Sequence, residues 1–166
     1  HFIFNCLSSI GNCVEQKRLD QAENYLSKFA KLLRKMLIIS EKPEVILKDE
    51  MEYLELYLDM EKMRFGDKFD YTFVIDEKVN TENISIPVMM LQPFLENSIK
   101  HGFTNIKKPG LIKIIVQFID NEYLHILIED NGIGRSKAIE LRQSNDLEKS
   151  FGIQITQDRL FYLNSH

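Results

Sequence analysis

The stretch LQPFLENSIKHG, residues 91–102, decides which fold the rest of the chain can adopt. Its apolar side chains recur at helical spacing, which predicts a helix with one face toward a core. Asn97, Lys100 and His101 fall at i, i+3 and i+4, so they share another face of that helix. This face offers an amide oxygen for a hard cation, an ammonium for phosphate charge and an imidazole beside them. The helix therefore predicts a site for a phosphate-bearing ligand.

The second informative stretch is DNGIG, residues 130–134, which follows the apolar run Tyr123–Glu129. Gly132 and Gly134 permit a sharp turn, a close approach of the backbone to a ligand, or a hinge. A buried Asp130 would accept a hydrogen bond from an amine, and adenine carries one. Each stretch alone is a weak signal, because a core helix and a plain hairpin turn explain them equally well. In this order and at this separation, they predict a nucleotide site.

The composition is that of an ordinary soluble protein. The chain has 166 residues, 44% of them hydrophobic, and a net charge of −4, which argues against nucleic-acid binding because phosphate backbones select basic faces. The apolar runs are too short to cross a membrane. Cys6 and Cys13 do not have the spacing of a metal site, and we interpret them as reduced core or interface thiols in a cytosolic setting.

Residues 1–68 are predicted to form a helical domain and residues 69–166 a mixed one, with the boundary near Phe65–Asp67. Three runs are expected to be strands, the last two joined as a hairpin: Phe69–Ile75, Leu111–Ile119 and Tyr123–Glu129. Pro87–His101 is expected to be helical, starting close to Pro93. Arg135–Lys149 suits either a lid or a plain surface connector, and Gly152–Leu163 is expected to be a closing helix.

Three helices are expected in the first domain. The first has an apolar stripe formed by Ile3, Leu7, Ile10 and Val14. The second is expected to start with a capping box at Asp20 and Glu23. The apolar face of the third is too wide for one neighbour, and it includes Leu47, Met51, Tyr53, Leu54, Leu56, Tyr57, Leu58, Met60 and Phe65. A monomeric bundle explains this width, but a homodimer that completes the bundle explains it better.

These motifs resemble those of sensor histidine kinases of the LytS/YehU type, whose catalytic part belongs to the ATPase superfamily of gyrase, heat-shock chaperones and MutL. HFIFN, residues 1–5, resembles the phosphoacceptor box, and RFGD, residues 64–67, resembles the end of the third helix. LQPFLENSIKHG resembles the N box and DNGIG the nucleotide box. The resemblance implies an α+β protein, in which a helical dimerisation and phosphoacceptor region precedes an α/β two-layer sandwich of the Bergerat type that binds ATP.

The resemblance also implies residue roles. His1 becomes the phosphorylated histidine, Asn97 the magnesium ligand and Asp130 the acceptor of the adenine amine. Lys100 would assist catalysis near the phosphates. The residues expected to surround ATP are Asn97, Lys100, His101, Asp130, Gly132, Gly134 and Gly152. The implied function is autophosphorylation of His1 by Mg-ATP and transfer of the phosphoryl group to an aspartate of a response regulator.

The chain departs from the family in three places. Ser150 precedes Phe151 and Gly152 where the family has a Gly-x-Gly pair, and the Asn-Pro that usually precedes the acceptor histidine is absent. The closing strands expected after His166 are absent too. We therefore expect a cytoplasmic piece, truncated at both ends, of a parent protein anchored in the inner or plasma membrane. The sheet would then have an open edge.

Several alternatives stay open on sequence alone. The chain could be a related ATPase or serine kinase on the same fold, or a degenerate dimerising module with weak or no nucleotide binding. Pro93 stands where a hydrolase would hold a water-activating carboxylate, which favours transfer. Asn5 could hold the acceptor imidazole or a phosphate oxygen, or be solvated. Glu96 is interpreted as a solvent-facing carboxylate and His125 as a surface or hydrogen-bonded strand residue.

Overall fold

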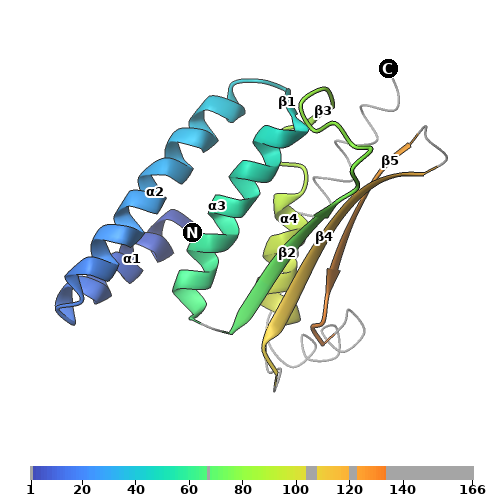
Figure 1. Cartoon of the computed structure of the whole chain (residues 1–166). Helices are drawn as coiled ribbons and strands as arrows, with labels where there is room; N and C mark the ends of the chain where they lie inside the picture. The colour runs from blue at the N-terminus through green and yellow to red at the C-terminus, as the bar shows by residue number, and fades with distance from the viewer. Residues whose placement is uncertain (1, 67, 104–107, 120–122, 134–166) are drawn as a thin grey trace, which may run out of the picture. The chain divides into compact units, whose positions relative to one another are not determined.

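The computed structural model describes residues 2–66, 68–103, 108–119 and 123–133 and has a mixed helix and sheet fold (Figure 1). The chain divides into two compact units. A helical unit contains residues 1–67 together with Thr81–Val88, and a sheet unit contains residues 68–80 and 89–166. No pattern in the sequence predicted that Thr81–Val88 would join the helices.

The helical unit contains α1 (Phe2–Glu15), α2 (Leu19–Ser40) and α3 (Leu47–Phe65) (Figure 1). Its first helix ends because Lys17 adopts a left-handed conformation with φ 58°, so that the Lys17 and Arg18 amides donate back to carbonyls of the last turn. The predicted capping box at Asp20 is wrong. Arg18 is the N-cap residue, and its side chain makes no capping hydrogen bond. Asp20 lies within the first turn, where its negative charge interacts favourably with the helix dipole.

The apolar stripe predicted for α1 is not the side of the helix that is buried in the core. Cys6 and Cys13 are buried, whereas Ile3, Leu7 and Val14 are exposed. Apolar residues of this helix form two overlapping stripes, and periodicity cannot tell which of them meets the neighbouring helices. The cysteines are free thiols in the core, as expected.

Most of the wide apolar face of α3 is buried within the chain, including Leu54, Leu58 and Met60. The uncovered apolar side chains of this unit instead lie mainly on the other two helices: Ile3, Phe4, Leu7, Val14, Leu19, Leu26, Leu37 and Ile38. Ion pairs from Lys28 to Asp59 and from Lys35 to Asp49 fix the register of α2 against α3. The expectation that the third helix needs outside partners is therefore corrected: the surface that lacks cover belongs to α1 and α2.

Two short strands complete the helical unit. β1 (Glu44–Ile46) pairs antiparallel with β3 (Ser85–Pro87), and the amide of Leu47 donates to the Ile84 carbonyl at 2.8 Å. Neither strand was predicted, because three residues carry no measurable alternation and their pairing joins segments about 40 positions apart.

The sheet unit contains β2 (Phe69–Ile75), β4 (Gly110–Ile119) and β5 (Tyr123–Asp130), in the order β2–β4–β5. β2 runs parallel to β4, and β5 pairs antiparallel with β4 as expected for the predicted hairpin. The residues proposed for its turn, 120 and 121, lie outside the described residues. Buried side chains from the strands and from residues 91–99 form the core of this unit: Phe69, Leu91, Leu95, Ile99, Ile112, Ile114 and Val116.

The helix predicted over Pro87–His101 is shorter and differently wound. Pro87 ends β3, and α4 (Gln92–Asn97) begins only at Gln92, with Pro93 in its first turn. A missing amide costs little there, as anticipated. The chain then continues as a π-helix, η1 (Ser98–Gly102), in which the Phe103 amide donates to the Ser98 carbonyl five residues back, at 3.2 Å.

The stability of the helical unit should fall at alkaline pH. Burial, with a smaller contribution from the Glu61 carboxylate, raises the pKa of the Cys6 thiol to about 11, and burial raises the pKa of Tyr25 to about 12. Above pH about 9 the unfolded thiol ionises while the folded one keeps its proton, so the free energy of unfolding decreases as pH rises toward 11. Urea unfolding at pH 8 to 11 measures this slope, and Cys6→Ala should make it shallower. An equal slope in both proteins would contradict the prediction.

Candidate functional site

Ser98 connects the helix of the first motif to the carboxylate of the second. Its side chain is buried, and Oγ donates to Asp130 Oδ2 at 2.8 Å, with the Phe94 carbonyl 3.2 Å away. The Gly132 amide donates to the other carboxylate oxygen, Oδ1, at 2.9 Å. Donors on both oxygens fix the rotamer of Asp130. Because Asp130 is exposed in the structure, the expectation that it would be buried is wrong.

Gly102 and Gly132 let the two motifs approach each other closely. The Ile133 amide donates to the Gly102 carbonyl at 2.9 Å. A Cβ added at Gly132 would lie 2.5 Å from the Gly102 oxygen and 2.7 Å from Asp130 Oδ1. No real Cβ tolerates such distances to backbone, so glycine at position 132 is required by the contact itself.

Asn131 ties the second motif to the start of β4. Its Oδ1 accepts from the Leu111 amide at 2.7 Å, and its Nδ2 donates to the Pro109 carbonyl at 3.1 Å. The Asn131 backbone amide also donates to the Leu111 carbonyl at 3.2 Å, and together these bonds hold the turn after Asp130.

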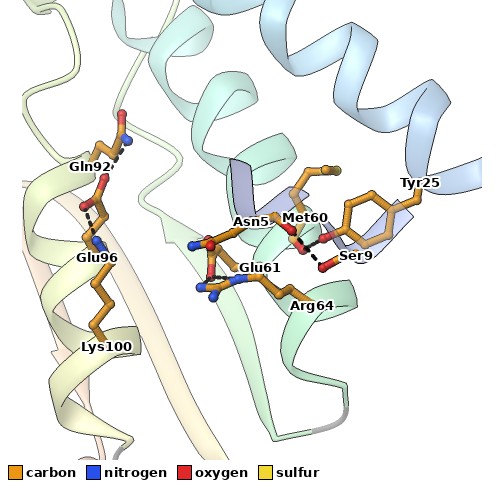
Figure 2. A network of polar contacts seen from close by, with 9 residues as sticks. All are labelled: Asn5, Ser9, Tyr25, Met60, Glu61, Arg64, Gln92, Glu96 and Lys100. Atoms are coloured by element: carbon orange, nitrogen blue, oxygen red, sulfur yellow. Dashed lines mark hydrogen bonds and ion pairs between the residues drawn. The ribbon is translucent and has the colours of Figure 1, made fainter. Parts of the chain in front are cut away.

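Asn97 is the last residue of α4, and its amide is oriented by the same helix. Nδ2 donates to the Pro93 carbonyl at 2.7 Å, which points the amide nitrogen back along the helix. On the same element, the Glu96 carboxylate accepts from Gln92 Nε2 at 2.8 Å and from Lys100 Nζ at 3.1 Å (Figure 2). Glu96 is half-buried and paired, so the interpretation of a solvent-facing carboxylate is wrong.

The π-helix changes the spacing argument for the first motif. Asn97 belongs to the α-helical part, whereas Lys100 follows it in the wider turn of η1. The expectation that Asn97, Lys100 and His101 share one face of an α-helix is therefore wrong, because the helix changes its winding between Asn97 and Lys100. Lys100 is about half exposed and bound to Glu96. The side chain of His101 lies outside the described residues.

Comparisons with known proteins assign the chain to a family. Residues 1–69 match the model of the family described as "Histidine kinase". The sensor histidine kinase YpdA of Escherichia coli is 31% identical over 148 residues, which are 89% of this chain and 25% of YpdA. The chain belongs to the LytS-type sensor histidine kinases.

Two further relatives are similar over most of the chain. The sensor histidine kinase BtsS of Escherichia coli is 33% identical over 135 residues, which are 79% of this chain and 22% of BtsS. The sensor histidine kinase/phosphatase LytS of Staphylococcus aureus is 29% identical over 137 residues, 82% of this chain and 23% of LytS. The chain spans about a quarter of the length of these curated relatives. Sensor histidine kinases act in two-component signalling, so the chain belongs to a kinase family of that kind.

The residues that the LytS-type resemblance selects fall into two groups. Asn97, Lys100, Asp130 and Gly132 are described and lie within the sheet unit. The other positions lie outside the described residues: His1, Gly134, Gly152 and the whole of Arg135–Leu163.

Sequence reasoning missed Ser98 and the role of Asn131. A signal for Ser98 was present, because it follows Leu91 by seven residues and Leu95 by three, on the helix face that was expected to be buried. A hydroxyl on such a face needs a partner. His125 is half-buried on β5, and its Nδ1 has no hydrogen-bond partner within the described part of the chain.

The donor set fits a magnesium ion held together with a nucleotide. Mg²⁺ is usually held by one or two protein oxygens, with phosphates and water filling the other positions, and the amide oxygen of Asn97 is of the right kind. Residues 2–66, 68–103, 108–119 and 123–133 contain no group of three His, Cys, Asp or Glu that could hold a metal alone. In the same residues, no helix is long and apolar enough to cross a membrane.

Proposed function

We propose that the chain is the kinase core of a two-component sensor, which phosphorylates itself on His1 with ATP and passes the phosphoryl group to an aspartate of a response regulator. One observation carries the proposal. The Ser98 hydroxyl, next to Asn97, donates to Asp130 at 2.8 Å, so the two motifs expected to hold opposite ends of ATP are in direct contact. The family relationship supports the same reading.

Within this proposal, the sheet unit is an ATP-binding sandwich of the Bergerat type. Asp130, fixed by Ser98 and Gly132, accepts a hydrogen bond from the adenine amine. Asn97 holds magnesium. The close contact between Gly102 and Gly132 leaves backbone atoms, rather than side chains, beside the adenine base. Lys100 leaves Glu96 to reach the phosphates, because a partly exposed ion pair is weak and exchanges readily with an anionic ligand.

The acceptor chemistry suits a histidine. The pKa of an unperturbed imidazole is about 6.5, so the ring is mostly neutral and nucleophilic at neutral pH. One ring nitrogen forms a bond to Pγ while the bond from Pγ to the bridging oxygen breaks, and its electron pair stays on ADP. The proton on the other ring nitrogen is released to solvent. Magnesium held by Asn97 would neutralise charge on the phosphates.

The helical unit is proposed to form a homodimer. Its uncovered apolar side chains lie on α1 and α2, where Phe4 is 73% exposed and Leu19 64% exposed. A second copy would remove these surfaces from water. The parent protein is proposed to be anchored in a membrane, with this part in the cytoplasm.

Incubation with radiolabelled ATP tests the function. We expect acid-labile, base-stable label that mass spectrometry under basic conditions maps to His1. Acid-stable label would indicate a serine kinase, and release of phosphate without label would indicate an ATPase. Negligible heat on calorimetric titration with Mg-ATP would instead support a dimerising module without nucleotide binding.

Ser98→Ala is expected to weaken Mg-ATP binding about tenfold. Its hydroxyl fixes Asp130, and a hydrogen bond to a charged group contributes about 1.5 to 3 kcal/mol, reduced here by the exposure of Asp130. Calorimetric titration measures the change. Ser40→Ala is the matched control, because Ser40 Oγ donates only locally to the Leu37 carbonyl on an exposed turn. Equal affinities of the two variants would contradict the role of Ser98.

A further inference from the structure

Glu96 is the central acceptor of a short chain of polar side chains on α4 and η1. Its Oε1 accepts from Gln92 Nε2 at 2.8 Å, and its Oε2 accepts from Lys100 Nζ at 3.1 Å (Figure 2). Because each oxygen has a donor, the carboxylate is held in one orientation. The ion pair joins the α-helical turn to the π-helical one, since Glu96 belongs to α4 and Lys100 to η1.

Lys100 supplies the permanent positive charge of the first motif. Residues 92–102 contain no other lysine or arginine, and the Lys100 side chain is 49% exposed. An ammonium has three N–H donors and no acceptor, so a second anion that reaches it competes with Glu96 for the same charge. The residues proposed to hold magnesium and adenine, Asn97 and Asp130, lie in the same unit as this lysine.

Separation of the ion pair costs little on either side. A partly exposed pair contributes little to stability, because water competes for both charges. When Lys100 leaves, Glu96 keeps the hydrogen bond from Gln92, and 32% of its side chain is exposed to water. The carboxylate is therefore not left buried and unpaired, which would be strongly unfavourable. Lys100 is thus held by a partner from which it separates easily.

We propose that Glu96 is a positioning residue that holds Lys100 in the empty site and releases it to the phosphates of the nucleotide. The proposal rests on the function proposed above. Each phosphate contact of Lys100 must first displace the carboxylate, so Glu96 lowers the affinity for ligands that carry phosphates and leaves the affinity for the nucleoside unchanged. The pair favours ligands with several phosphate charges, because a single carboxylate charge competes poorly with them.

Two other roles of Glu96 make different predictions. If the pair only stabilises the junction of α4 and η1, its loss would disturb Ser98 and weaken binding of the nucleoside as well as of ATP. If Glu96 only repels the phosphates directly, its removal would strengthen ATP binding whether or not Lys100 is present. Release of Lys100 requires an effect that is confined to ligands with phosphates and that depends on Lys100.

Calorimetric titration of the whole chain with Mg-ATP and with adenosine separates these explanations. Glu96→Gln removes the charge and keeps the size of the side chain, so we expect Mg-ATP to bind about threefold more tightly and adenosine to bind as it does to wild type. Glu82→Gln is the matched control, because Glu82 forms an ion pair with Lys48 at 2.7 Å in the helical unit. It makes the same change in net charge and should leave both affinities unchanged.

The variant Lys100→Met completes the experiment. Both side chains of the pair are partly exposed, so each variant should fold, which circular dichroism checks. Lys100→Met should bind Mg-ATP about tenfold more weakly than wild type. Adding Glu96→Gln to it should cause no further change, because no lysine remains to be released.

Three results would overturn the inference. The first is the same gain in Mg-ATP affinity in the Lys100→Met background, which would indicate direct repulsion. The second is Mg-ATP binding to Glu96→Gln that is equal to or weaker than that of wild type. The third is an equal change in the affinities for adenosine and Mg-ATP. Failure of the wild-type chain to bind either ligand is a different result, which would overturn the proposed function itself.

Discussion

Asn97→Ala is expected to lower the rate of His1 phosphorylation by about 100-fold or more while the chain stays folded. Alanine has no oxygen to hold magnesium, so charge developing on the phosphates loses its main stabilising group. The fold survives because the intramolecular bond that is lost, from Asn97 Nδ2 to the Pro93 carbonyl, contributes about 1 kcal/mol. Initial rates with radiolabelled ATP and thermal unfolding followed by circular dichroism measure both effects.

Gln92→Ala is the control for Asn97→Ala. Gln92 is another amide of α4, and its Nε2 donates to Glu96 at 2.8 Å. Its removal should leave the phosphorylation rate within about twofold of wild type, because it has no part in the proposed magnesium site. Equal rates of the two variants would mean that Asn97 is not a ligand of the reacting complex.

Gly132→Ala is expected to have the second large effect. The new methyl group would meet the Gly102 carbonyl oxygen at 2.5 Å and its Cα at 2.6 Å, so backbone must move. Such overpacking typically costs about 1 to 3 kcal/mol. The movement would also displace the amide that donates to Asp130 Oδ1 and weaken Mg-ATP binding at least tenfold. Urea unfolding and calorimetric titration measure the two losses.

Gly11→Ala makes the same chemical change where there is room. Gly11 lies within α1, and no atom comes within 4 Å of an added Cβ. Alanine should therefore stabilise the helix by about 0.5 to 1 kcal/mol and leave nucleotide binding unchanged. If Gly132→Ala were as stable as Gly11→Ala, the close contact between the two motifs would be wrong.

Local chemistry made much of the fold predictable. The β-branched run Phe69–Ile75 is a strand with the predicted bounds, and the runs that became β4 and β5 differ from the prediction by one residue each. The helices of the first unit also lie where their apolar periodicity placed them. Errors arose where local signals were degenerate. Two apolar stripes compete on α1, and Pro93 limits where α4 begins without revealing that the chain continues as a π-helix.

Residues of the candidate site were predictable in kind but not in their contacts. Asn97 was predictable because its amide shares a short motif with the ammonium of Lys100. Asp130 was predictable because its carboxylate comes directly before the glycines of the second motif. Ser98 was not predictable, since its importance comes from a partner 32 residues away. The pairing of Glu61 with Arg64 has helical spacing, but the burial of Glu61 is a property of packing.

The sequence by itself determined the order and type of the main elements and the residues that are proposed to bind ATP, because backbone periodicity and side-chain chemistry are local. Only the tertiary structure decided that Thr81–Val88 pairs with Glu44–Ile46, that Ser98 and Gly132 fix Asp130, and that Cys6 rather than Leu7 faces the core. These choices depend on which surfaces meet when the chain closes. A contact between residues far apart in sequence does not change the hydrophobic periodicity of either segment.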